Sequence, residues 1–262
     1  MMACLIASLG ASCSKDVTGL SDAESAEGTV EMAVTGQIGE LATVELTKST
    51  VHNAPSLMWS QYDHVFVYEC GASPKCLGSL SVQSTENGGR IAKLGNSINA
   101  PTGDDPTLAF VHVSTNPGSA PEVSSDGSIS ISLAEQGSET PMVLVGKVEH
   151  YDRGASPAPL FVDFEFATSV VSAIVTGLPA NNAVTRAEIT NLNTRCEINL
   201  SGSGAPSVGG ATCGTIVKEA LPSEALYIID ERGMAVINIA VVETAASATD
   251  RKITFTVRPF TD

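Results

Sequence analysis

Short stretches of alternating apolar and polar residues run through the sequence from residue 29 onward, with Gly, Pro, Asn and Asp between them. Successive side chains of a strand point to opposite faces, so a period of two predicts β-strands with one buried face. Only Phe166–Val171 is compatible with a helical turn. The expected strands are Thr29–Val34, Leu41–Leu46, His64–Tyr68, Ser79–Gln83, Arg90–Leu94, Leu108–Val113, Ser128–Leu133, Met142–Val148, Leu160–Phe166, Val171–Thr176, Val184–Asn191, Cys196–Leu200, Ala225–Ile229, Ala235–Val242 and Ile253–Val257.

Two dipeptides predict turns within this pattern. Asn87-Gly88 tolerates positive φ and favours a type I′ hairpin between its flanking strands. Asp126-Gly127 turns the chain into Ser128–Leu133, where Ile129, Ile131 and Leu133 share one face.

The number and spacing of the strands predict an all-β fold of two antiparallel sandwiches. The chain has 262 residues, 43% of them hydrophobic and 16% charged, which is enough apolar material for two packed cores. The polar, turn-rich stretch Glu135–Pro141 marks the expected boundary. We therefore expect an N-terminal domain over residues 29–138 and a C-terminal domain over residues 139–262.

The formal net charge is −15. A surface of this sign repels a phosphate backbone, so no nucleic-acid partner is expected. The negative charge is expected to keep copies of the protein apart in solution by electrostatic repulsion. The alternative is that it binds a specific cationic partner.

The first residues have the character of an export signal. Residues 1–12 form a short apolar run that ends in Gly10-Ala11-Ser12, directly before Cys13. Small residues before a cysteine resemble a bacterial lipobox, in which the thiol receives a diacylglycerol. Residues 1–12 are therefore expected to be a lipoprotein signal peptide, Cys13 the lipidated residue, and residues 13–28 a tether. The alternative is a short buried N-terminal segment.

Secretion changes the interpretation of the other cysteines. Cys70 and Cys76 bracket a turn, and Cys196 and Cys213 bracket a Gly/Ser-rich loop. In an oxidising compartment both pairs are expected to form disulfides. Free buried thiols are the alternative. No Cys-x-x-Cys motif occurs and the histidines are scattered, so no metal site is expected.

The sequence carries no established catalytic motif and implies no cofactor, so no enzymatic activity is expected. Asp104-Asp105 reads as a solvated acidic loop, with a Ca²⁺ site as the alternative. Asp163 and Glu165 lie on one face of a strand, and an exposed face is favoured over a glycoside-hydrolase pair. Trp59 and Tyr62 are assigned to core packing, with stacking on sugar as the alternative.

Three segments together resemble the fimbrillin-like family of type V pilus lipoproteins from Gram-negative anaerobes. The stretch from Trp59 to Tyr68, WSQYDHVFVY, is similar to the family's aromatic, Gly-Asp and apolar strand, with Tyr62 at the glycine position. Ile129–Gln136 followed by Pro141-Met142 is similar to its interdomain link. Phe164–Ile174 is similar to the opening strands of its second domain. The resemblance implies two transthyretin-like β-sandwiches, lipoprotein export to the outer membrane and assembly into pili.

In that family a trypsin-like protease cuts after an arginine in the N-terminal domain, and a neighbour's strand fills the groove that opens. No arginine precedes Arg90 here, and Lys48 is the candidate protease site. Whether the subunit belongs to the shaft, the anchor or the tip stays open.

The C-terminal strand alternates Ile253, Phe255 and Val257, which makes it either an edge strand of its own sandwich or a strand donor. The expected function is a lipid-anchored fimbrial subunit or adhesin whose partners are other pilus subunits and a host protein or glycan. A surface glycan-binding lipoprotein is the alternative.

Overall fold

The computed structural model describes residues 28–39, 43–44, 57–152, 160–202, 207–209, 213–242 and 252–259. Within these ranges the chain forms β-strands, one 3-10 turn at Asn87–Gly89 and no α-helix, which confirms the all-β prediction. No described helix is long and apolar enough to cross a membrane. The strands are β1 (Thr29–Ile38), β2 (Thr43–Val44), β3 (His64–Glu69), β4 (Lys75–Glu86), β5 (Ile91–Asn99), β6 (Leu108–Val113), β7 (Ser128–Ser132), β8 (Glu135–Gln136), β9 (Val143–Val148), β10 (Leu160–Phe166), β11 (Ser169–Val175), β12 (Asn182–Asn193), β13 (Arg195–Asn199), β14 (Ser207–Gly209), β15 (Cys213–Glu219), β16 (Tyr227–Ile228), β17 (Ala235–Val241) and β18 (Ile253–Pro259).

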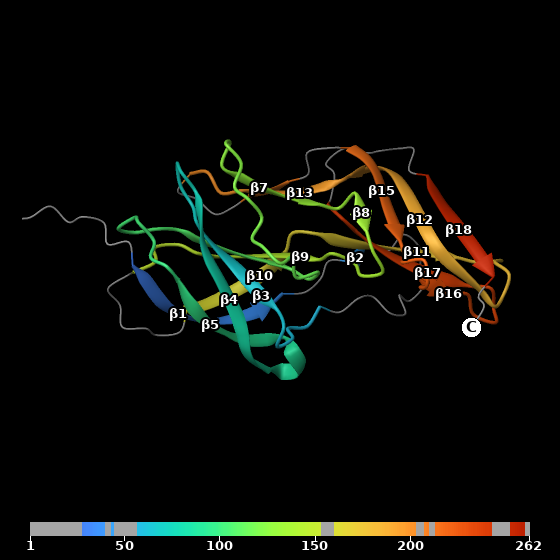
Figure 1. The fold of residues 1–262 in the computed structure, drawn as a ribbon, viewed down its shortest axis with the longest axis horizontal. Helices are drawn as coiled ribbons and strands as arrows, with labels where there is room; N and C mark the ends of the chain where they lie inside the picture. The colour runs from blue at the N-terminus through green and yellow to red at the C-terminus, as the bar shows by residue number, and fades with distance from the viewer. Residues whose placement is uncertain are drawn as a thin grey trace, which may run out of the picture.

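A closed barrel forms one end of the elongated molecule (Figure 1). Its described strands follow the order β1-β10-β9-β6-β3-β4-β5. β1 pairs with β10 in parallel, and the other neighbours are antiparallel. Every one of these strands sends apolar side chains into the interior, where Val65, Leu80, Phe110 and Phe164 are fully buried.

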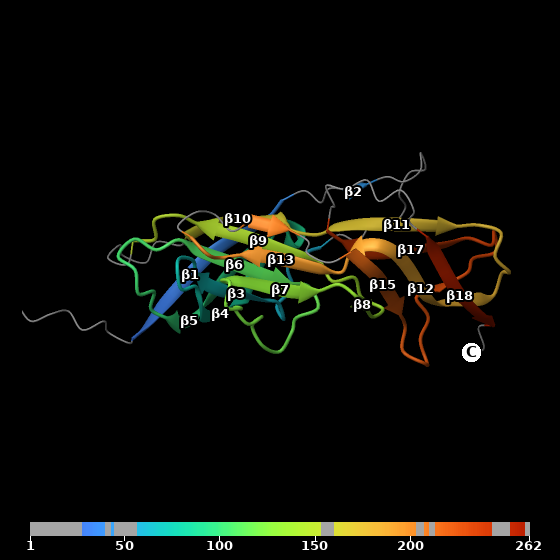
Figure 2. The ribbon, with the colours of Figure 1, turned by 90° about the horizontal axis from the view of Figure 1, so that it is seen from above.

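A small sheet, in the order β14-β13-β7, covers part of the outside of this barrel (Figure 2). Phe66 and Val111 point outward from the barrel and share a core with Ile129 and Ile198 of the small sheet. β3 and β6 are therefore buried on both faces, which explains their nearly continuous apolar sequences.

Two further sheets form the other end of the molecule. One has the order β17-β11-β2, and the other the order β16-β12-β15-β8 with β18 paired to β12. Val171 and Ile237 from the first sheet pack with Ile189 and Ile216 from the second, so the two sheets enclose a common core. That core is continuous with the one beneath the small sheet.

The sheets join strands from both sides of the expected boundary. β9 and β10 follow residue 138 yet belong to the barrel, and β13 crosses back to pair with β7. The boundary at residues 138–139 therefore does not coincide with a break between sheets. The division into two transthyretin-like domains stays a prediction.

Two local expectations are corrected. The β4–β5 hairpin is present, but the predicted two-residue turn is wrong, because β4 ends at Glu86 and β5 begins at Ile91. Asn87, Gly88 and Gly89 all adopt positive φ in the longer loop. Phe166–Val171, whose sequence is compatible with a helical turn, forms none, because Ala167 N–H donates to the Val143 carbonyl at 2.8 Å and keeps the chain beside β9.

Candidate functional site

β1 occupies a seam in the barrel between β5 and β10. It runs antiparallel to β5 from Thr29 opposite Asn99 to Gln37 opposite Ile91, and pairs in parallel with β10 from Val34 opposite Leu160. Its inward residues Met32, Val34, Gly36 and Ile38 are buried, and the residues that alternate with them face outward. β1 thus supplies both the hydrogen bonds and the apolar side chains that close the barrel.

The C-terminal end of β1 is fastened to both neighbours. The guanidinium of Arg90 donates to the carbonyls of Ile38 and Gly39, each at 3.3 Å. Gly39 N–H donates to the Phe164 carbonyl of β10 at 2.9 Å. Continuous chain leads from here toward Lys48, which lies outside the described residues.

β18 lies at the edge of its sheet and holds the candidate donor residues. Ile253, Phe255 and Val257 are half-buried against the core, and the residues between them are exposed, as the alternation predicted. Among the described strands, only β12 pairs with β18. Near the C-terminal end of β18, the guanidinium of Arg258 donates to the carbonyls of Pro222 and Glu224 at 2.9 and 2.8 Å.

The segment that carries the first part of the resemblance closes one end of the barrel. Trp59 is buried and meets the ring of Phe164 edge-on at 5.2 Å between centroids. Asp63 accepts hydrogen bonds from Ser60 N–H at 2.7 Å and from Asn116 Nδ2 at 3.0 Å, which fixes the turn. The core assignment of Trp59 is confirmed, but Tyr62 is 76% exposed and its core assignment is wrong, because it lies on this turn.

The link between the halves is tied to the C-terminal sheets by two buried polar side chains. Gln136 donates to the Ala240 carbonyl at 2.7 Å and accepts from Ala240 N–H at 3.0 Å. Lys218 of β15 donates to the Glu139 carbonyl at 2.9 Å and to Thr140 Oγ1 at 3.0 Å. Burial lowers the pKa of Lys218 to about 8.

Sequence reasoning found Gln136 through the resemblance and missed Lys218. The alternation of β15 could have predicted its burial, because Lys218 lies two residues after the buried Ile216 and therefore on the same face of the strand.

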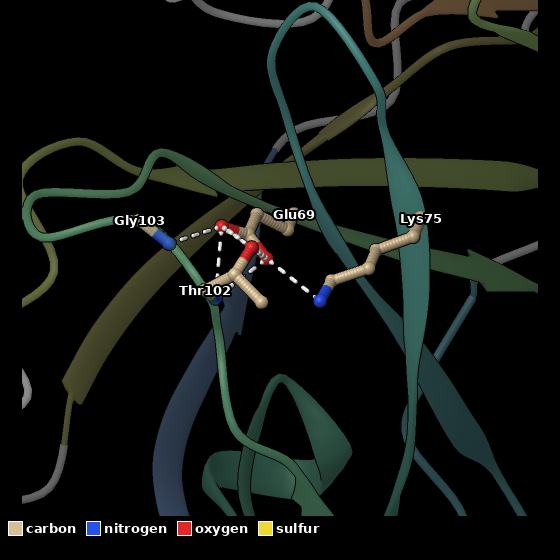
Figure 3. A network of polar contacts seen from close by, with 4 residues as sticks. All are labelled: Glu69, Lys75, Thr102 and Gly103. Carbon is tan, nitrogen blue, oxygen red and sulfur yellow. Dashed lines mark hydrogen bonds and ion pairs between the residues drawn. The ribbon is translucent and has the colours of Figure 1, made fainter. Parts of the chain in front are cut away.

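A second buried charge that the sequence did not indicate is Glu69 (Figure 3). Its carboxylate accepts hydrogen bonds from Thr102 N–H at 2.9 Å and Gly103 N–H at 2.8 Å, and lies 3.5 Å from Lys75 Nζ. Burial by itself would raise the pKa of Glu69, but these hydrogen bonds and the lysine outweigh it and hold the pKa below its ordinary value. The carboxylate therefore fastens the loop after β5 to the end of β3.

The carboxylates considered for chemistry do not gather into a site. Asp105 pairs at 2.6 Å with His150, and both are exposed, which agrees with a solvated loop. Asp163 and Glu165 are exposed on the outside of β10, as predicted. Among the described residues, no three His, Cys, Asp or Glu side chains are placed to hold a metal ion.

The two expected disulfides are not formed in the structure, where Cys70, Cys76, Cys196 and Cys213 are free thiols. Cys196 is a buried residue of β13, whereas Cys213 is exposed at the start of β15, so the two side chains lie in different surroundings. Cys70 and Cys76 both contact the core from the β3–β4 hairpin. The lipidation candidate Cys13 lies outside the described residues.

No protein-family model matches the sequence, and no curated protein is significantly similar to it. Solved structures resemble it weakly. A "putative cell adhesion protein" of Bacteroides uniformis is 18% identical, with a TM-score of 0.46 over 87% of this chain and 79% of the other. One of the same description from Bacteroides ovatus is 12% identical, with a TM-score of 0.46 over 87% and 86%.

A fimbrial anchor protein from Porphyromonas gingivalis is also similar. It is 12% identical, with a TM-score of 0.37 over 88% of this chain and 79% of the other. These neighbours are described as adhesion and fimbrial proteins.

Proposed function

We propose that this protein is a structural subunit or adhesin of a fimbrium, anchored to the outer membrane by a lipid on Cys13 and joined to its partners by strand addition. The observation that carries the proposal is the position of β1. β1 completes the barrel between β5 and β10, and the only covalent connection from it to the rest of the barrel passes through the segment that contains Lys48.

Cleavage at Lys48 would leave β1 held by hydrogen bonds and apolar contacts alone. Its departure would expose the hydrogen-bonding edges of β5 and β10 and an apolar groove between them. An extended strand from another subunit satisfies such edges with its backbone and fills the groove with alternate side chains.

β18 is the strand of this chain proposed to enter a partner. It has the required alternation and lies at a sheet edge, with one neighbouring strand among those described. Donation requires β18 to leave β12 and Arg258 to release the carbonyls of Pro222 and Glu224. Other pilus subunits are therefore the proposed partners, and a host protein or glycan the proposed target of the assembled fimbrium.

Two experiments test this function. Cys13→Ala should move the exported protein from the membrane fraction to the soluble fraction, with Cys4→Ala as the matched control that stays membrane-bound. Membrane retention of Cys13→Ala, with no acyl group found by mass spectrometry on the parent protein, would refute the anchor.

The second experiment tests assembly. A specific protease site is placed at Lys48 in the full chain, and the folded protein is cut and inspected by electron microscopy with candidate partner subunits present. Strand addition predicts joined subunits only after cutting. Unjoined subunits after complete cutting and loss of β1 would contradict assembly through this seam.

A further inference from the structure

The seam that β1 fills contains one position where the neighbouring side chains leave no space for a β-carbon. A β-carbon placed on Gly36 would lie 2.8 Å from Cε2 of Phe164 and 3.3 Å from Cδ1 of Leu94. Gly36 lies within a regular strand and does not adopt positive φ, so lack of space explains the glycine, not the backbone conformation. The residue that Phe164 faces across the seam must therefore be small.

The Phe164 ring is enclosed by the barrel core. Gly146 of β9 lies nearby, where an added β-carbon would be 2.4 Å from Cγ1 of Val162 and 3.4 Å from Cδ1 of Phe164. The ring is fully buried and meets Trp59 edge-on. Phe164 thus occupies the space that a side chain at Gly36 would need, and such a side chain requires the buried ring to move.

This packing sets a sequence requirement for any strand in the seam. β1 presents Met32, Val34, Gly36 and Ile38 inward, which is the pattern apolar-x-apolar-x-Gly-x-apolar. In a strand of fixed register only alternate residues face inward, so the glycine can match Phe164 in one register alone.

β18 does not meet the requirement. The sequence from Arg251 to Asp262 contains no glycine. If Ile253 takes the place of Met32, Val257 falls at the position of Gly36. Moving the strand by two residues in either direction brings Phe255 or Pro259 there instead. Each has a β-carbon, and Pro259 also lacks the N–H that the ladder uses.

We infer that the β1 seam accepts only a strand that carries glycine opposite Phe164, so that it is completed by a different protein bearing this pattern and not by β18 of a second copy. This inference rests on the proposed strand addition. It makes the glycine the specificity element of the seam and makes assembly from copies of this chain alone unfavourable.

Substitutions in the intact chain test the glycine requirement without any strand exchange. Gly36→Ala should lower the thermal midpoint by several degrees and Gly36→Val by more, while Ala33→Val, on the exposed face of the same strand, should change it little. Phe164→Leu should reduce the loss caused by Gly36→Val. Equal midpoints for Gly36→Val and Ala33→Val would overturn the inference.

A displacement experiment tests the choice of partner. The full chain, with a specific protease site at Lys48, is cut while folded, and release of the fragment that contains β1 is followed by gel filtration and mass spectrometry. The competitors are peptides of residues 28–39, the same peptide with Gly36→Val, residues 251–262, and residues 251–262 with Val257→Gly.

The β1 peptide should displace the fragment at a concentration about tenfold or more below that of the β18 peptide, a difference of about 1.4 kcal/mol or more. Gly36→Val should abolish displacement, and Val257→Gly should confer it on the β18 peptide. Equal displacement by the β1 and β18 peptides would overturn the inference. Failure of every peptide, including that of β1, would instead refute strand addition at this seam, and the stability of Gly36→Val would still decide the glycine requirement.

Discussion

The ammonium of Lys218 donates a 3.0 Å hydrogen bond to Oγ1 of Thr140, so that a buried charge on β15 holds the link between the halves of the chain. The same ammonium reaches the Glu139 carbonyl. Because burying an ammonium costs free energy, the attachment of this link depends on the protonation state of Lys218.

The first prediction concerns alkaline pH. The pKa of Lys218 is about 8 in the folded protein, against an ordinary value of 10.5. The unfolded chain binds more protons between these values, so this group makes the free energy of unfolding rise with pH from about 8 to 10.5. The rise is about 3 kcal/mol at most.

Chemical denaturation of the wild type and Lys218→Met across this range checks the effect. The stability difference between them should change in favour of the wild type as pH rises. The exposed Lys93→Met serves as control and should show no such change. A constant difference between the wild type and Lys218→Met would contradict the prediction.

The second prediction concerns Glu69. Glu69→Gln replaces an acceptor of several hydrogen bonds by an amide that also presents donors, and should cost about 2–3 kcal/mol of unfolding free energy. Lys75→Met removes only a half-exposed ion-pair partner and should cost less than about 1 kcal/mol. Hydrogen exchange at the amides of Thr102 and Gly103 should accelerate in Glu69→Gln. Unchanged exchange would show that the carboxylate does not hold the loop.

The third prediction concerns mild acid. His112 is buried beside Trp59, and its Nδ1–H donates to the His64 carbonyl at 2.9 Å. Burial lowers its pKa from the ordinary 6.5, although the His64 carbonyl and the charge of Asp63 oppose the shift. The stability linked to His112 is therefore present above pH 6.5 and is lost as pH falls through the lower, folded-state pKa.

Denaturation between pH 7.5 and 5 measures this loss. In His112→Leu the fall in stability over this range should be smaller than in the wild type. His150→Gln is the control of opposite sign, because Asp105 raises the pKa of the exposed His150. An identical pH slope in His112→Leu and the wild type would show that His112 does not titrate on unfolding.

The fourth prediction concerns the thiols. Burial raises the pKa of Cys70 to about 11 and that of Cys196 to about 12, so both should resist alkylation at neutral pH until the protein unfolds. The exposed Cys213 should react first. Peptide mapping after brief alkylation of the exported protein, without reductant, distinguishes thiols from bridges. A Cys196–Cys213 bridge found there would mean that β13 and β15 are arranged differently from this structure.

Local periodicity was sufficient to place most strands, because alternation and burial follow from the same backbone geometry. Ile129, Ile131 and Leu133 share a buried face, as their spacing required. Local periodicity was not sufficient to show which strands are neighbours. The pairing of β1 with β10 joins residues more than a hundred positions apart, and no short pattern records such a contact.

The polar residues also fall into two groups, those whose position followed from local spacing and those whose position depended on distant contacts. Asp163 and Glu165 were placed correctly on an exposed face, because two-residue spacing determines the face of a strand. Glu69 was missed, because its partners Thr102 and Gly103 come from a loop that only the folded sheet brings to it.

The order of synthesis determines when β1 gains each of its two neighbouring strands. β1 emerges first, β5 follows some sixty residues later, and β10 follows only after the rest of the barrel (Figure 1). Domains begin to fold from the N-terminus during synthesis, and contacts distant in sequence form late. Until β10 arrives, one edge of β1 has no neighbour in the barrel. During that interval β5 alone holds β1, so a foreign strand has fewer hydrogen bonds and apolar contacts to displace than it meets in the complete barrel.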